Sequence, residues 1–264
     1  MLFPEAPRVV YRKNPLDLVV TQLRFPPILR ISRDSPADFQ ERIRDQFPNY
    51  SKTQELTLEM PFSPLVFSGG GGGIRPALED YGCRHQFISE DGKRKITLGQ
   101  DTLSFMTREY ERWETFSSVL MMAFDALCEL YRPKHFLRVG LRYVDVLRRE
   151  RLRLNGTPWT KLLRPSILGI MGEDITVGDV KRFENQCELD LDNSQGRIRM
   201  RTFCGKYPAM GEEVFVIDSD FFVTGKIVGE EAMNRLDFLN QQASRLIRWC
   251  ITDDLHQAME PEST

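Results

Sequence analysis

The sequence predicts an α+β protein in which antiparallel β-sheets form two similar halves, with packed helices and a long C-terminal helix. Three observations predict this fold. Segments rich in β-branched residues alternate with turn residues along most of the chain, as in antiparallel meanders. Two long segments repeat apolar residues at three- and four-residue spacing, as amphipathic helices do. The order strand, helix, meander occurs twice, so we expect one two-lobed unit over residues 1–264, with halves at about 1–132 and about 133–260.

The first half begins with a strand expected over 16–31. Pro26 and Pro27 must interrupt it or confine it to an edge, because proline cannot donate a ladder hydrogen bond. Ser35 followed by Pro36 is a helix start signal, and that helix is expected to end near residue 47. The remaining elements expected in this half are strands over 56–67, 81–89, 93–98 and 102–107, with a hairpin turn at Asp91-Gly92, and a helix over 110–131.

The second half repeats the order. A strand over 137–147 is followed by a short helix and turn over 159–171, and three strands are expected between residues 175 and 223. A terminal helix is expected over 230–259, with a break near Thr252, where a capping residue precedes two acids.

Residues 188–201 predict a hairpin whose two strands carry opposite charge. Acids alternate with leucines before a turn at 193–196, and arginines alternate with Ile198 and Met200 after it. Because strand side chains alternate between faces, the hairpin has one ionic and one apolar face. The ionic pairs expected are Asp192 with Arg197, Asp190 with Arg199, and Glu188 with Arg201.

The carboxylates of this hairpin, Glu188, Asp190 and Asp192, allow two interpretations. In the first, the arginines neutralise them on a solvated face, where each exposed pair contributes about a few tenths of a kcal/mol. In the second, the carboxylates hold a divalent cation beside a polyphosphate, as in a metal-dependent phosphohydrolase. Closely matched opposite charges favour the first interpretation, so no metal or other cofactor is predicted.

A basic cluster is a second candidate site. Its arginines, with Phe25 and Tyr143 as aromatic platforms, would make an anion-binding groove for nucleic acid or a nucleotide if they converge. The alternative is that each arginine pairs with a local acid such as Asp145 or Glu150. The residues concerned are Arg24, Arg138, Arg142, Arg148, Arg149 and Arg151.

Catalytic motifs are poorly supported. The three histidines, His85, His135 and His256, stand in no metal-ligand spacing, and no Gly-x-Ser-x-Gly elbow occurs. Asp218 and Asp220 are candidates for a general base, but Asp-Ser-Asp between apolar runs is also the composition of an ordinary turn. Gly69 to Gly73 lack the Lys-Ser or Lys-Thr of a phosphate-binding loop, which favours a surface loop. The sequence therefore favours binding over catalysis.

The terminal helix carries an apolar seam with an alternating four-three step, as in a helix packed against another helix. Such a seam is either internal to the chain or an interface with a protein partner or a second copy. Its residues include Leu236, Leu239, Ala243, Leu246 and Cys250.

Bulk composition narrows the class of protein. A net charge of −2 gives no global basic excess, so nucleic-acid binding would need a local patch. Five cysteines, far apart in the sequence, are typical of buried thiols in a reducing compartment. The chain shows neither a signal-peptide pattern nor an apolar run of membrane-spanning length, so we expect a soluble cytoplasmic protein without membrane contact.

Five stretches, at 15–27, 38–48, 110–116, 138–145 and 217–222, together resemble a sporadically distributed family of uncharacterised bacterial proteins of similar length. The resemblance implies an accessory role, for example in antiviral defence or a toxin–antitoxin locus, and carries over no catalytic residue. The leading hypothesis is a non-catalytic binding or adaptor subunit that recognises its partner through the arginine-bearing strands and the helix seam. The second hypothesis is a nucleic-acid or nucleotide binding protein that uses the arginine-rich sheet face. The third and weaker one is the metal-dependent phosphohydrolase.

Overall fold

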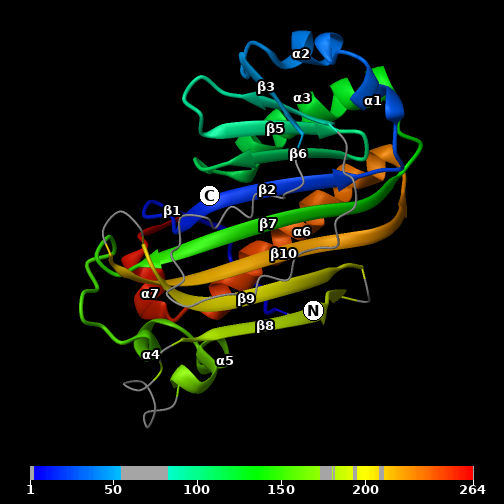
Figure 1. Cartoon of the computed structure of the whole chain (residues 1–264). Helices are drawn as coiled ribbons and strands as arrows, with labels where there is room; N and C mark the ends of the chain where they lie inside the picture. The colour runs from blue at the N-terminus through cyan, green and yellow to red at the C-terminus, as the bar shows by residue number, and fades with distance from the viewer. Residues whose placement is uncertain are drawn as a thin grey trace.

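The fold is given by a computed structural model, which describes residues 3–54, 83–172, 180, 182–192, 195–207 and 211–263. Nine described strands form one antiparallel sheet in the order β3-β4-β5-β6-β2-β7-β10-β9-β8 (Figure 1). A separate pair, β1 with β11, joins the two ends of the described chain. The strands are β1 Val9–Tyr11, β2 Leu16–Arg24, β3 Asn49–Gln54, β4 Cys83–Ile88, β5 Arg94–Gly99, β6 Thr102–Thr107, β7 Phe136–Arg148, β8 Glu184–Asp190, β9 Arg197–Lys206, β10 Glu213–Ile227 and β11 Pro261–Ser263.

Helices α3 and α6 cover one face of the sheet, and both lie behind the strands in Figure 1. We call this the inner face and the opposite one the outer face. Helix α6 packs on β7 and β10, while α3 packs on β6 and on α2. The antiparallel sheet and the long C-terminal helix confirm the predicted α+β class. The helices are α1 Leu29–Arg33, α2 Ala37–Ile43, α3 Trp113–Tyr131, α4 Trp159–Leu162, α5 Pro165–Leu168, the 3-10 turn η1 Gly169–Gly172, α6 Gly229–Cys250 and α7 Asp253–Ala258.

The two halves of the chain have similar element orders. The first runs from β2 through α1 and α2 to the strands β3 to β6 and then α3, and the second runs from β7 through α4 and α5 to β8, β9, β10 and then α6. In each half the first strand pairs with the last strand of the meander, and the two first strands, β2 and β7, pair with each other. One continuous sheet therefore spans both halves, and its centre is built from β2, β7 and β10.

Strand β7 shows how the sheet separates its two faces. Val139, Leu141 and Leu147 point to the inner face and join the main core with α6. Arg138, just before Val139, and Arg142, just after Leu141, point to the outer face, as the alternation of strand side chains requires. The outer face also holds a small apolar cluster of Leu18, Val144, Val146, Phe203, Val214 and Val216.

Several expected elements differ in detail. Strand β2 ends at Arg24 and helix α1 begins at Leu29, because the prolines between them stop the ladder, so the strand expected over 16–31 is too long. Pro36, not Ser35, is the residue that precedes α2, and no side chain caps it. The element expected over 159–171 consists of α4, α5 and η1. The expected strand over 56–67 and the glycine run at 69–73 lie outside the described residues.

The C-terminal helix breaks where the sequence predicts. Helix α6 ends at Cys250, and α7 begins at Asp253 after an extended Ile251. The side chain of Thr252 accepts a hydrogen bond of 3.4 Å from the backbone N–H of Leu255, which is the expected N-cap contact.

Candidate functional site

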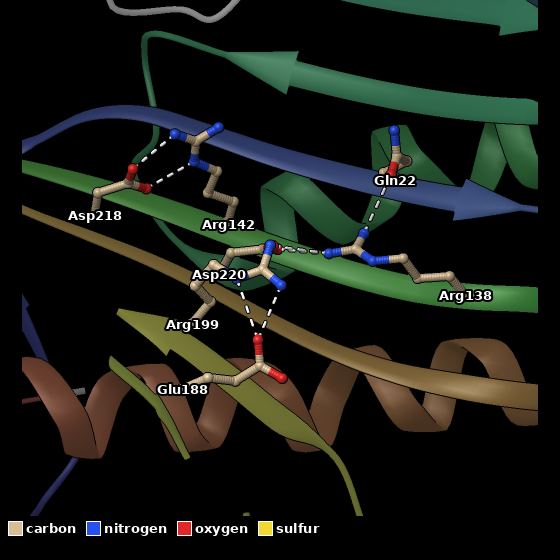
Figure 2. A network of polar contacts seen from close by, with 7 residues as sticks. All are labelled: Gln22, Arg138, Arg142, Glu188, Arg199, Asp218 and Asp220. Atoms are coloured by element: carbon tan, nitrogen blue, oxygen red, sulfur yellow. Dashed lines mark hydrogen bonds and ion pairs between the residues drawn. The ribbon is translucent and has the colours of Figure 1, made fainter. Parts of the chain in front are cut away.

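The outer face of the central strands carries a network of ion pairs between neighbouring strands (Figure 2). Arg142 on β7 donates two hydrogen bonds, each of 2.7 Å, to Asp218 on β10. Arg138 donates two more, of 2.7 and 2.9 Å, to Asp220, and a third of 3.2 Å to Gln22 on β2. Asp218 and Asp220 therefore lie within strand β10, and the interpretation of this segment as a turn is wrong.

Gly140 makes the position of Arg138 possible. A Cβ atom on residue 140 would lie 2.1 Å from Nη1 of Arg138, so the guanidinium group occupies the space of the missing side chain. The same guanidinium lies 5.0 Å from the ring centroid of Phe222, the cross-strand partner of Gly140. A cation over an aromatic face adds to the ion pair with Asp220.

The charged hairpin forms, but its register differs by two residues from the prediction. Strands β8 and β9 pair Glu188 with Arg199 and Asp190 with Arg197. Glu188 accepts hydrogen bonds of 2.9 Å from both of these arginines, and the bonds, that from Arg199 first, lower the pKa of its carboxyl. Arg201 pairs instead with Glu184, at 2.7 Å.

Leu191 marks the end of the hairpin in the observed register. Leu191 is 1% exposed and closes the turn through a 2.8 Å hydrogen bond from its backbone N–H to the carbonyl of Gly196. A Cβ on residue 196 would lie 3.0 Å from the backbone carbonyl oxygen of Phe222, so glycine allows this close approach of two strands. The predicted register, which pairs Asp192 with Arg197, would instead place Leu191 opposite Ile198, which in the structure lies opposite Leu189.

The proposed metal ligands do not converge. Glu188 is held by two arginines on the edge hairpin, and Asp190 lies opposite Arg197. Within the described ranges, no group of three or more His, Cys, Asp or Glu side chains is placed to hold a metal ion. The hypothesis of a phosphohydrolase with ligands Glu188, Asp190 and Asp192 therefore loses its structural basis.

The other arginines of the basic cluster lie at separate points of the sheet. Arg24 pairs with Asp101 at 3.1 Å, while Arg148 and Arg149 pair with Glu212 at 2.8 Å and Glu213 at 3.0 Å. Arg151 is exposed in the turn that follows β7. Five of the six predicted arginines are thus ion-paired, and their partners are not the acids Asp145 and Glu150 that the sequence suggested.

The helix seam is an internal contact, which corrects its interpretation as a partner surface. Helix α6 lays these residues on the inner face of β7 and β10, so they belong to the main core. The exposed fractions are 0% for Leu236, Leu239 and Cys250, 2% for Leu246 and 9% for Ala243.

A pocket between α6, the inner face of β7 and β10, and the segments at 7–16 and 110–113 was not predicted from the sequence. It encloses about 100 Å³. Its floor is formed by the sheet residues Tyr143, Asp145, Ile217 and Ser219, all buried. The pocket opens to the surface, because some of the residues that line it, such as Arg112, are exposed.

Two polar side chains in the floor have no hydrogen-bond partner among the residues that the structure describes. Asp145 is 5% exposed, and its carboxylate forms no hydrogen bond or ion pair with the described residues. Ser219 is 2% exposed, and its Oγ likewise has no hydrogen-bond partner. Ile217, the cross-strand neighbour of Asp145, lies two residues from Ser219, so the two polar groups are diagonal neighbours on the sheet.

Burial changes the proton affinity of the pocket's side chains. Desolvation, with the nearby charge of Asp218, raises the pKa of Asp145 from 3.8 to about 7. Desolvation also raises the pKa of Tyr110 to about 12 and that of Tyr143 well above its ordinary value. The hydroxyl of Tyr143 donates a 2.8 Å hydrogen bond to Oδ1 of Asn240 on α6, which fixes this side of the pocket.

A signal for this site was present in the sequence. In β7, Val139, Leu141, Tyr143 and Leu147 define one apolar face by their alternation, and Asp145 falls on that face. An acid at an inward-facing strand position is costly unless it has a partner or a ligand.

Among the described residues, no helix combines the length and the apolar character needed to cross a bilayer. No protein-family model matches the chain, and no curated protein matches it. The resemblance to a sporadic bacterial family therefore stays a prediction, and the case for function depends on the two faces of strands β7 and β10.

Proposed function

We propose that this chain is a non-catalytic binding protein whose ligand site is the pocket between helix α6 and the inner face of β7 and β10. The observation that carries the proposal is the unpartnered carboxylate of Asp145 in the pocket floor. A buried polar group without a partner is destabilising by about 1–3 kcal/mol, and more when it is charged. A ligand that pairs with Asp145 removes that penalty.

The location of the pocket supports the same function. It lies at the centre of the nine-stranded sheet and is walled by the chain's N-terminal segment, the residues before α3, and α6. A ligand would therefore contact elements from both halves of the chain. Concave pockets with apolar walls and a few converging polar groups are the usual form of small-molecule sites.

The outer face supports a structural role for its charges. Each acid of the network in Figure 2 is already paired with an arginine from a neighbouring strand. Binding of a phosphate there would have to break one of these ion pairs. The nucleic-acid hypothesis therefore finds less support than the pocket.

The implied place in a bacterial accessory system, with an adaptor role and a protein partner, stays a prediction. It is compatible with a ligand-binding protein, because such a subunit can report the presence of a small molecule to its partner. Co-purification with proteins encoded beside it is the direct test.

A small-molecule screen by thermal denaturation tests the ligand site. A compound that binds only the folded protein at 100 times its Kd stabilises it by about 2.7 kcal/mol. We expect such compounds to raise the Tm of the wild type but not of Ala243→Phe, which fills the pocket from α6. Asn234→Phe, at an exposed position of the same helix, is the matched control and should respond like the wild type. Equal responses of all three proteins, or no response of any, would contradict the proposal.

A further inference from the structure

The geometry points to an organic cation as the ligand of this pocket, with an ammonium group paired to Asp145 and an apolar part against the aromatic wall. This inference rests on the proposed function, because it names the chemical class of the ligand for that same site. It follows from the pocket's charges, its aromatic side chains, its unsatisfied hydrogen-bonding groups and its size.

The charge pattern leaves Asp145 as the group in need of a counter-ion. Two arginines that line the pocket have acids of their own: Arg8 pairs with Glu114 at 2.6 Å, and Arg248 pairs with Asp253. A third, Arg112, is exposed at the mouth, where water screens its charge. The buried end of the pocket therefore has a net negative charge whenever Asp145 is ionised.

Aromatic rings form much of the wall. The rings of Tyr110 and Tyr143 meet edge to face, with centroids 5.8 Å apart, and Tyr11, Trp113 and Phe221 also line the pocket. A cation near such rings is attracted by their quadrupoles, and the attraction grows when water is excluded. A carboxylate combined with several aromatic side chains is thus suited to a cation that also has an apolar part.

The unsatisfied groups fit an ammonium donor. The carboxylate of Asp145 accepts hydrogen bonds when ionised, and the Oγ of Ser219 can accept another. An ammonium group has three N–H donors and can satisfy both. A carboxylate or phosphate ligand would instead meet the like charge of Asp145 at the floor.

The size of the pocket limits the ligand to a small molecule. The pocket's volume is about 100 Å³, and one water occupies roughly 10–15 Å³ of such a volume. The space therefore holds several waters or a compound about as large as one substituted ring.

The pH dependence of binding separates this ligand class from others. An ammonium ion binds the ionised form of Asp145, so its affinity should rise about tenfold per pH unit up to pH ~7, where the carboxyl titrates, and level off above it. A neutral ligand that uses the protonated acid would show the opposite trend. The other titratable or charged groups that line the pocket with Asp145 or act on it across the inner face are Arg8, Tyr11, Tyr110, Glu111, Arg112, Tyr143, Arg248 and Cys250. Asp218 acts on it from the outer face of the sheet.

Three probes of matched shape test the inference: benzylammonium, benzyl alcohol and benzoate. We expect titration calorimetry to show binding in the order benzylammonium, benzyl alcohol, benzoate. Asp145→Asn should weaken benzylammonium binding roughly 30-fold or more, as expected when one partner of a buried charge pair is neutralised, and should remove its pH dependence. Asp125→Asn, which neutralises an exposed acid on α3, is the matched control and should leave the affinity unchanged.

The outcomes distinguish the two proposals. If benzoate or benzyl alcohol binds as tightly as benzylammonium, or if Asp145→Asn binds benzylammonium as well as the wild type does, the cation assignment is overturned. It is also overturned if benzylammonium does not bind while other compounds in the thermal screen stabilise the wild type but not Ala243→Phe. In each of these cases, compounds that raise the Tm of the wild type but not that of Ala243→Phe would still support the pocket as the ligand site.

Discussion

The guanidinium group of Arg138 and the carboxylate of Asp220 are joined by two hydrogen bonds, 2.7 and 2.9 Å long, that connect strands β7 and β10 (Figure 2). Their side chains are 20% and 24% exposed, so the pair is only partly screened by solvent. The pair can form because Gly140 has no Cβ, and the guanidinium group occupies the space that a Cβ would fill. The geometry of an ion pair on the outer face thus depends on the absence of a methyl group.

Gly140→Ala should break this pair without changing any charge. The new Cβ would meet Nη1 of Arg138 at 2.1 Å, and because this atom ends a flexible side chain, the guanidinium can move and the fold remains. We expect a loss of about 1–2 kcal/mol in the free energy of unfolding, measured by urea denaturation, for a charge-assisted bidentate contact that is partly exposed. Gly229→Ala, with no atom within 4 Å of its new Cβ, should be neutral or stabilising. Equal effects of the two variants would contradict the account.

Gly196→Ala tests the observed hairpin register. Its Cβ would lie 3.0 Å from the backbone carbonyl oxygen of Phe222 and 3.3 Å from a methyl of Val223, and the backbone atom cannot move aside easily. We expect destabilisation of about 1–3 kcal/mol, as for other overpacked sites. Gln195→Ala changes the exposed neighbouring residue and should stay within ~0.5 kcal/mol of the wild type. A neutral Gly196→Ala would argue against this register.

The hairpin shows which part of the fold the sequence could predict. Alternation of acids and leucines, then of arginines and apolar residues, correctly predicts two strands and their faces. It cannot choose between registers two residues apart, because a pattern with a period of two pairs acids with arginines equally well in both. In the observed register the backbone N–H of Leu191 donates to the carbonyl of Gly196, a closing contact that the alternating pattern does not specify.

The terminal helix and the pocket show a similar limit. A four-three apolar seam shows that one face of a helix is buried, but not whether a helix or a sheet covers it. In this chain the seam from Leu236 to Cys250 lies on β7 and β10. Asp145 could be found as an acid at an inward position of a strand, yet its lack of a partner becomes visible only when the surrounding elements are in place.

Glu188→Gln should increase the affinity of the outer face for anions. This glutamate holds both Arg197 and Arg199, so its neutralisation releases two guanidinium groups at an exposed edge of the sheet. We expect weak binding of a labelled single-stranded oligonucleotide to the wild type, and tighter binding to the variant that declines steeply as salt rises. Fluorescence anisotropy measures both.

The matched control for this experiment is Glu231→Gln, which removes an acid paired with Arg235 on α6, away from the hairpin. It should bind like the wild type. Tight, salt-dependent binding by the wild type that is lost in Arg138→Gln or Arg142→Gln would instead favour the nucleic-acid hypothesis.

Asp145→Asn should change how stability depends on pH. The folded protein holds the proton of Asp145 up to pH ~7, whereas the unfolded chain releases it near pH 3.8. Between these values the folded state binds the extra proton, so the stabilising contribution is complete below the lower value and is lost, by ~1.4 kcal/mol per pH unit, as pH rises to the upper one. The wild type should therefore lose on the order of 4 kcal/mol relative to Asp145→Asn between pH 4 and pH 7. Urea denaturation across this range, with Asp125→Asn as the control for an exposed acid, measures the difference. If the two asparagine variants follow the same curve, Asp145 is ionised in the folded protein at little energetic cost, and the pocket must already provide it with a partner.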